Sequence, residues 1–387
     1  MRFPEFSGEW KSKFINDLAS VVGGGTPDTS VKSFWDGNIQ WFTPSEIGKN
    51  KYVDSSLRTI TEEGLNNSSA KLLPPHTILL SSRATVGECS LSLKECATNQ
   101  GFQSLIAQSC DTNFLYYLIQ TKKKDLIRKA CGSTFLEISA NEVRKIQVKI
   151  PYDNEQKKIA DFLSLIDERI FTQNKIIEKY ESLIQAIIYK EKMDGISKGT
   201  WQRIALCKVL QERNEKNVNG RTICSVSVSL GVVNQVEYLG RSFAAKQTSH
   251  YNIVKYGDIV YTKSPTGNFP YGIIKRSNIR EDVAVSPLYG VYIPASDSIG
   301  VFLHFYFMQP SNAFNYLYPL IQKGAKNTIN ITNGRFLENS VPLPISRSET
   351  NTIAGILKTI QTKIEIEKNL LQSYTKEKKY LLRQMFI

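Results

Sequence analysis

The chain has 387 residues, more than one hydrophobic core ordinarily supports, so we expect two or three domains. A hydrophobic content of 41% with 22% charged residues is typical of a folded protein and excludes a largely disordered one. The formal net charge of +13 attracts polyanions, which makes nucleic acid the first partner to test against the alternative of a basic but merely soluble protein.

Other classes are excluded by what the sequence lacks. No run approaches the roughly eighteen apolar residues of a membrane-spanning helix, so we expect no membrane partner. The start, Met1-Arg2-Phe3-Pro4, is unlike a secretory signal, which favours the cytoplasm. The six cysteines form no close C-x-x-C pair and the three histidines lie far apart, so neither a disulfide framework nor a metal site is expected.

In chain order, short strand-like runs and turns alternate with two long helical segments. The predicted domains are an α+β module at 1–150, a long helix at 151–194, a linker at 195–199, a second α+β module at 200–343 and a second long helix at 344–387. Each module contains one helical stretch, at 113–129 and at 301–322. The fold class is therefore α+β, with each module followed by a long helix.

An internal duplication supports this division. Residues of the first long helix match residues 194 positions later, namely Glu155, Ile159, Ala160 and Leu163 with Glu349, Ile353, Ala354 and Leu357. In both copies a proline-bounded segment, ending at Pro151 or Pro344, precedes the helix. The second half of the chain thus repeats the first.

Both long helices carry a seven-residue apolar pattern that is typical of a coiled-coil seam. In the first helix the seam runs through Ile159, Leu163, Ile166, Ile170, Gln173, Ile177, Tyr180, Ile184 and Ile187. Gln173 and its counterpart Glu367 are polar exceptions. They are candidates for setting the coiled-coil register, and the alternative is that both face solvent in part.

Several strings in this order carry a family resemblance. They are Gly24-Gly25-Thr26-Pro27, Trp35-Asp36-Gly37-Asn38-Ile39-Gln40-Trp41, Leu79-Leu80-Ser81-Ser82-Arg83-Ala84, Ala97-Thr98-Asn99-Gln100-Gly101-Phe102, Arg213-Asn214-Glu215-Lys216-Asn217, Tyr256-Gly257-Asp258-Ile259-Val260-Tyr261 and Val285-Ser286-Pro287-Leu288-Tyr289. Together with the two proline-then-heptad helices, they resemble the specificity subunit of type I restriction-modification systems. The resemblance covers nearly the whole chain.

The resemblance implies two target-recognition domains that each read half of a split double-stranded DNA target. It also implies that the two helices pair as an antiparallel coiled coil, that two methyltransferase subunits dock on them and that motor-nuclease subunits join. No catalysis and no cofactor is then expected in this chain, while S-adenosylmethionine, ATP and Mg belong to the partner subunits. Because the two modules differ in sequence, the target should be asymmetric.

The helix length fits that implication. The seam from Ile159 to Ile187 spans roughly 42 Å at about 1.5 Å per residue. Sites on one face of B-DNA recur about every 34 to 36 Å. The helices are therefore expected to hold two readers about one duplex turn apart.

Base reading needs polar side chains on loops, with Lys and Arg contacting phosphates. The candidate DNA-binding residues are Thr43, Ser45, Lys49, Lys51, Ser82 and Arg83 in the first module and Arg241, Lys246, Lys263, Ser264, Thr266 and Asn268 in the second. For each of them, the alternative is an ordinary solvated surface residue. Asn99 and Gln100 are further possible readers, but satisfying backbone groups is the favoured role.

Two other functions compete with this reading. Asn268-Phe269-Pro270-Tyr271 is close to the Asn-Pro-Pro-Tyr string of adenine methyltransferases, but no Gly-rich methyl-donor loop follows a strand, and a turn is favoured. A stand-alone bipartite DNA-binding or regulatory protein is the main alternative. Neither a nuclease carboxylate cluster nor a Walker loop is evident in the sequence.

Overall fold

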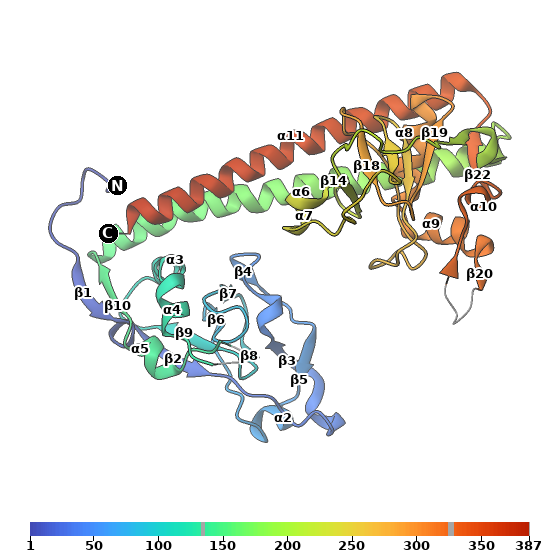
Figure 1. Cartoon of the computed structure of the whole chain (residues 1–387). Coiled ribbons are helices and arrows are strands. Elements are labelled where there is room, and N and C mark those ends of the chain that lie inside the picture. The colour runs from blue at the N-terminus through green and yellow to red at the C-terminus, as the bar shows by residue number, and fades with distance from the viewer. Residues whose placement is uncertain (133–135, 324–328, 387) are drawn as a thin grey trace. The chain divides into compact units, whose positions relative to one another are not determined.

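The computed structural model describes residues 1–132, 136–323 and 329–386, and it divides into two compact units (Figure 1). Unit 1 comprises Met1–Lys175 and Asn369–Ile387, and unit 2 comprises Ile176–Lys368. Two long helices, α6 (Asp153–Ser197) and α11 (Arg347–Met385), each contribute one half to each unit.

The globular part of unit 1 consists of short strands and helices. Its strands are β1 (Lys11–Phe14), β2 (Ala19–Gly23), β3 (Trp35–Phe42), β4 (Tyr52–Val53), β5 (Arg58–Ile60), β6 (Ile78–Leu80), β7 (Cys89–Ser92), β8 (Cys96–Thr98), β9 (Gln103–Ala107) and β10 (Gln147–Ile150). Its helices are α1 (Ile15–Leu18), η1 (Lys32–Phe34), η2 (Pro44–Glu46), α2 (Glu62–Asn66), α3 (Thr112–Thr121), α4 (Lys123–Lys129) and α5 (Ala140–Arg144).

Unit 2 is built in the same manner. Its strands are β11 (Trp201–Ala205), β12 (Leu210–Glu212), β13 (Cys224–Ser227), β14 (Gly231–Asn234), β15 (Asn252–Val254), β16 (Ile259–Tyr261), β17 (Ile274–Arg276), β18 (Val283–Val285), β19 (Gly290–Pro294), β20 (Gln322–Lys323), β21 (Ile329–Asn330) and β22 (Ser340–Pro344). Its helices are η3 (Leu206–Lys208), α7 (Gln235–Leu239), α8 (Asp297–Phe307), α9 (Pro310–Leu317), η4 (Tyr318–Leu320) and α10 (Asn333–Phe336).

The two units share one sheet order. In unit 1 the strands lie in the order β2-β9-β6-β7, with β4 added at the edge, and in unit 2 the order is β12-β19-β16-β17. The central strands β6 and β16 are buried along their whole length, which explains their continuous apolar sequence. The duplication seen in the sequence therefore extends to the topology of the two sheets.

The start of each long helix is braced in the same way. Strand β1 pairs antiparallel with β10 ahead of α6, and β11 pairs antiparallel with β22 ahead of α11. The indole Nε1 of Trp10 donates to Oε1 of Glu155 at 3.4 Å, and that of Trp201 donates to Oε1 of Glu349 at 2.6 Å. Each indole also meets a phenylalanine ring of α3 or α8 edge-on. A repeated Trp–Glu contact thus ties each sheet unit to its helix.

The prediction that a linker begins at residue 195 is wrong, because α6 continues to Ser197. Gly195 lies within the helix against the ring of Trp201, where a Cβ would come within 1.9 Å of Cδ1. This glycine permits close packing rather than chain flexibility. The other predicted boundaries, 1–150, 200–343 and 344–387, stay predictions.

The seam residues of the long helices are mostly buried. In unit 1, Ile159, Leu163 and Ile166 of α6 share a hydrophobic cluster with Leu381 and Met385 of α11 and with the sheet. The helix ends are therefore part of the unit 1 core.

Candidate nucleic-acid interface

The β6–β7 hairpin of unit 1 ends in a closed, polar loop. The amide of Ser81 donates to the carbonyl of Glu88 at 2.8 Å, and the Ser81 hydroxyl donates to the carbonyl of Arg83 at 3.0 Å. Ala84 has φ of 63°, a conformation that non-glycine residues seldom adopt outside tight turns. The loop thus holds Arg83 in a defined position, with its guanidinium 3.8 Å from the carboxylate of Glu137 and partly exposed.

Three loops of unit 1 meet at Gly101. The amide of Ser82 donates to the Gly101 carbonyl at 2.8 Å, and Oδ1 of Asn99 accepts from the Gly101 amide at 2.9 Å. A Cβ on Gly101 would lie 2.9 Å from Cγ of Pro44, so the loops can approach only because a glycine is there. This junction brings the predicted residues of η2 and of the β6–β7 loop to one place, and it shows Asn99 serving the backbone.

The predicted residues of this junction differ in exposure. Ser45 is exposed, whereas Thr43 is half-buried and donates to Oε2 of Glu46 at 2.6 Å. Ser82 is wholly buried, so the prediction that its side chain reads DNA is wrong. Lys49 lies exposed beyond η2. Sequence reasoning placed Ser82 in a loop, but the backbone contact with Gly101 turns it inward.

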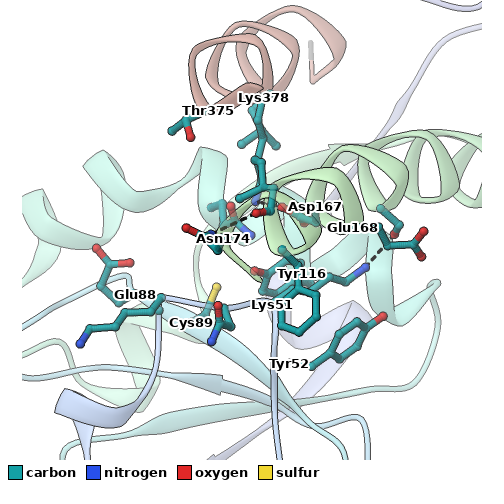
Figure 2. Close-up of a pocket in the computed structure, with 18 of the residues that line it drawn as sticks. Lys51, Tyr52, Glu88, Cys89, Tyr116, Asp167, Glu168, Asn174, Thr375 and Lys378 are labelled. Carbon is teal, nitrogen blue, oxygen red and sulfur yellow. Dashed lines mark hydrogen bonds and ion pairs between the residues drawn. The ribbon is translucent and has the colours of Figure 1, made fainter. Parts of the chain in front are cut away.

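Lys51 is a second correction, because it is only 9% exposed and lines a cavity of about 980 Å³ in unit 1 (Figure 2). Its Nζ donates to Oγ of Ser164 on α6 at 2.7 Å. It lies 4.9 to 5.8 Å from the ring centroids of Tyr52, Tyr116 and Tyr117. Burial lowers the pKa of the Lys51 ammonium to about 8. Lys51 is not placed to contact phosphate; it holds the β3–β4 segment to α6.

A polar network continues from this lysine through both long helices. Asp167 of α6 accepts from the Tyr117 hydroxyl at 2.7 Å and pairs with Nζ of Lys378 of α11 at 2.6 Å. Tyr117 belongs to α3, so the network links the sheet unit with both helix ends of unit 1. Its role is to position the sheet relative to α6 and α11 within this unit.

Unit 2 has an equivalent hairpin between β16 and β17, at residues 262–273. The amide of Thr262 donates to the Ile273 carbonyl at 2.9 Å. This hydrogen bond corresponds to the one from the Ser81 amide to the Glu88 carbonyl in unit 1. At the tip, Thr266 and Phe269 exchange two backbone hydrogen bonds of 3.1 and 2.9 Å around Gly267, which has φ of +51°. The tip is therefore a tight turn.

The hairpin of unit 2 carries most of the residues predicted for that module. Ser264, Thr266 and Asn268 are exposed, and Lys263 is half-buried. Burial lowers the pKa of the Lys263 ammonium. Asn268 lies within the tight turn between Thr266 and Phe269. The Asn-Phe-Pro-Tyr string therefore begins in a turn. The equivalent hairpins of the two units thus both present predicted DNA-binding residues.

Arg241 and Lys246 lie on a different segment, which follows α7. Gly240 ends that helix in the left-handed conformation, with φ of 73°. Both cations are exposed, and the guanidinium of Arg241 lies 4.5 Å from the ring centroid of Phe243. These two residues form an exposed basic segment of unit 2 that is separate in sequence from the β16–β17 hairpin.

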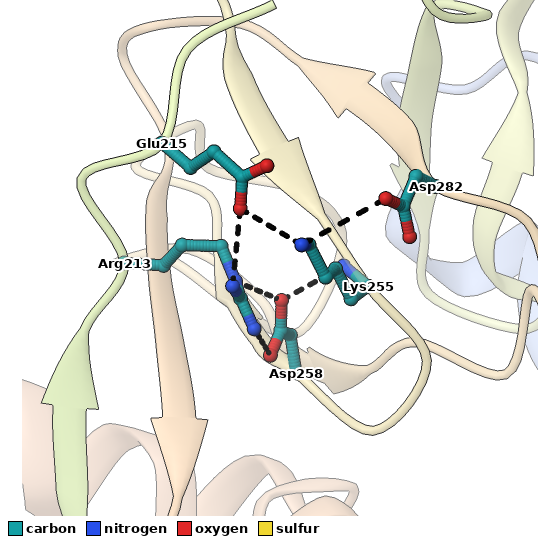
Figure 3. Close-up of polar contacts among 5 residues, drawn as sticks. All are labelled: Arg213, Glu215, Lys255, Asp258 and Asp282. Carbon is teal, nitrogen blue, oxygen red and sulfur yellow. Dashed lines mark hydrogen bonds and ion pairs between the residues drawn. The ribbon is translucent and has the colours of Figure 1, made fainter.

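One feature that the sequence reasoning missed is an ion-pair network at the turn that leads into β16 of unit 2 (Figure 3). Arg213 makes two hydrogen bonds to the buried carboxylate of Asp258, from Nε at 2.7 Å and from Nη2 at 2.9 Å. Glu215 pairs with Lys255 at 3.0 Å, and Lys255 lies 3.8 Å from Asp282. The carboxylate of Asp258 raises the pKa of the Arg213 guanidinium.

This network explains two of the motif strings. Arg213 and Glu215 come from one string and Asp258 from another, and their pairing anchors the turn that leads into β16. The opposite charges in the two strings were a usable signal. The pairing of Arg213 with Asp258 across 45 residues was not predictable, because one sequence does not show which charges meet.

Two properties of residues 1–132, 136–323 and 329–386 bear on function. Within these ranges no group of three or more His, Cys, Asp or Glu side chains is arranged to hold a metal ion. Within them, too, no helix combines the length and apolar character that crossing a membrane requires.

The repeated sheet with a long helix after each copy defines a class of two-unit, helix-linked proteins, and comparison with known proteins indicates the family that the chain resembles. Residues 7–182 match the family model "Type I restriction modification DNA specificity domain". The resemblance inferred from the motif strings is confirmed.

Two specificity subunits of other organisms are similar in sequence to part of this chain. The type I restriction enzyme MjaIX specificity subunit of Methanocaldococcus jannaschii is 32% identical over 237 residues, covering 56% of this chain and 55% of the relative. The EcoR124I/EcoR124II specificity subunit of Escherichia coli is 30% identical over 175 residues, 43% of each protein. The chain thus matches about half the length of these relatives.

The crystal structure of a type I restriction-modification S subunit from M. genitalium aligns with 100% of this chain and 99% of its own, with a TM-score of 0.59 and 15% identity. At that identity the likeness concerns the fold alone. It confirms a mixed α and β fold with long helices for the whole chain.

Proposed function

We propose that the whole chain is the sequence-specificity subunit of a type I restriction-modification complex and reads a bipartite, asymmetric DNA target. The observation that carries this proposal is the equivalence of the β6–β7 and β16–β17 hairpins, which lie at the same place in two sheets of the same order. Most of unit 1 lies within residues 7–182, which match the family's DNA specificity domain. The repeated topology supports the same role for unit 2.

The two hairpins suit different half-sites. The first presents Arg83, a side chain whose fork matches guanine O6 and N7. The second presents Asn268, which suits adenine N6 and N7, beside the hydroxyls of Ser264 and Thr266. Exposed Lys49, Arg241 and Lys246 are proposed to contact phosphates. Because the hairpin residues differ, the two halves of the target should differ as well.

The proposed antiparallel coiled coil of α6 and α11 is supported by contacts within each unit. In unit 1, Asp167 pairs with Lys378. In unit 2, Glu181 pairs with Lys368 at 3.0 Å. Higher-numbered residues of α6 therefore meet lower-numbered residues of α11, as antiparallel helices require. Gln173, which is buried, is the proposed register position of α6, with Glu367 as its counterpart in α11.

Two methyltransferase subunits are the proposed partners at the helix starts. Tyr152 and Phe162 near the start of α6 are exposed, and Ile345 and Ile356 at the start of α11 are exposed in the same way. Repeated exposed apolar side chains suit two copies of one partner. The chain itself is proposed to be non-catalytic, with S-adenosylmethionine, ATP and Mg held by methyltransferase and motor-nuclease subunits in the cytoplasm.

The test is co-expression with the methyltransferase subunit, followed by single-molecule sequencing of host DNA for N6-methyladenine. A split, asymmetric motif that appears only when this chain is present is the expected result. Arg83→Ala should relax one half of that motif, and Asn268→Ala the other. Methylation that is unchanged without the chain, in cells where the complex assembles, would contradict the proposal and favour a stand-alone DNA-binding protein.

A further inference from the structure

Beside the β16–β17 hairpin of unit 2 lies an aromatic cluster formed by Tyr271, Phe314 and Tyr318. Tyr271 lies on the returning side of the hairpin, and its ring centroid is 5.2 Å from that of Phe314 in α9 and 6.0 Å from that of Tyr318 in η4. The rings of Phe314 and Tyr318 are stacked, with centroids 5.4 Å apart and planes 9° apart. The three rings therefore pack together beside the hairpin.

Two of the three rings remain open to solvent. Phe314 is 39% exposed and Tyr318 is 58% exposed, while Tyr271 is half-buried. The neighbouring core is filled by other rings, since Phe336 stacks between Tyr261 and Tyr292 and is fully buried. The aromatic cluster is thus an exposed surface feature rather than a part of that core.

The shared fold does not require the cluster. The equivalent loop of unit 1, at residues 81–88, is shorter than residues 262–273 and contains no aromatic residue. The cluster therefore distinguishes unit 2 from unit 1. Its member Tyr271 lies on the same hairpin as the exposed Thr266 and Asn268, only a few residues from the proposed base-reading tip.

We infer that the aromatic cluster stacks on a nucleobase at the edge of the half-site read by unit 2, an inference that rests on the proposed DNA-reading function. The hairpin tip offers hydrogen-bonding groups for base edges, whereas ring faces match the π-face of a base. A base in a duplex shows its face only where the stack opens. The contact therefore entails local unstacking next to the half-site, as with other inserted side chains.

Binding is measured with the assembled complex and a duplex carrying the motif found by methylation sequencing. Tyr318→Ala and Phe314→Ala should each weaken binding about tenfold, the usual loss for a removed base–aromatic stack. Tyr318→Phe should retain affinity because the ring is kept. The slope of log affinity against log salt should not change, since no phosphate contact is lost. The control is Leu230→Ala, which removes an exposed apolar side chain from the β13–β14 turn.

A second readout locates the base. Duplexes with 5-iododeoxyuridine at successive positions of the half-site and its flanks are irradiated, and a cross-link to Tyr318 or Phe314 at one position is expected. Unchanged affinity together with no cross-link would overturn the inference, and so would loss of methyltransferase from the complex without loss of DNA affinity. If the wild-type complex selects no motif at all, the proposed function fails, and that outcome is distinct from either of these.

Discussion

At the scale of single residues, Lys49 and Lys51 show how neighbouring side chains of the same charge acquire different roles. Lys49 is exposed, whereas Lys51 is enclosed by tyrosine rings and bonded to Ser164. Burying an ammonium group costs free energy because the group loses its water. Here aromatic ring faces and a hydroxyl offset that cost. The local sequence does not separate the two lysines, because apart from Tyr52 the enclosing groups come from α3 and α6.

The salt dependence of DNA binding should distinguish these lysines. If Lys49 contacts a phosphate, Lys49→Met should reduce the slope of log affinity against log salt by about one, because one fewer counterion is released. Lys51→Met should leave the slope unchanged. Titrations of the assembled complex between about 50 and 200 mM salt provide the measurement. A reduced slope for Lys51→Met would show that this residue does reach DNA.

His304 should make unit 2 sensitive to acid. Its Nδ1 accepts from the amide of Arg276 at 3.1 Å, and burial, with the charges of Lys275 and Arg276, lowers its pKa from 6.5 to about 3. Between these values the unfolded chain binds a proton that the folded chain does not. Stability is therefore lost as pH falls from about 6.5 towards 3.

Replacing this histidine should remove that part of the acid sensitivity. His304→Asn keeps an acceptor but does not titrate, so it should lose about 2 kcal/mol less unfolding free energy than wild type between pH 6.5 and 4.5. Hydrogen exchange of α8 peptides in the full chain is the measurement. The exposed His250, changed to Asn, is the control. Equal acid losses for wild type and His304→Asn would refute the assignment.

At the scale of elements, the long helices were the most predictable part of the chain. Their seam residues recur at regular spacing, and such a pattern requires only local chain geometry. Gln173 is 5% exposed, so the alternative that it faces solvent does not hold, while its counterpart Glu367 is half-buried. Their role in setting the register stays a prediction.

Shortening both helices should shorten the spacer of the recognised DNA. Deleting residues 172–178 from α6 and 366–372 from α11 removes one heptad, about 10.5 Å, from each helix. The remaining seam residues stay on nearly the same face of each helix. We expect the methylated motif to lose about three base pairs between its halves. Deletion from one helix alone is the control and should abolish assembly. An unchanged spacer with active methylation would exclude the ruler role.

At the scale of the whole molecule, duplication supplies two versions of one architecture. The repeated strand order, the paired strands before each helix and the Trp–Glu contacts are common to both units. The hairpins differ in length and composition. A protein that recognises two unlike DNA half-sites needs a framework shared by its two units and loops that differ between them, because specificity depends on side chains at the loop tips.

Sequence alone determined the two-module organisation, the long helices and the family resemblance. These depend on periodicity, repetition and local turn chemistry, which act over short stretches of chain. Tertiary structure alone decided that Ser82 and Lys51 face inward, that Gly195 packs within a helix and that Arg213 anchors Asp258. Each of these depends on contacts between residues far apart in the chain, which no local pattern encodes.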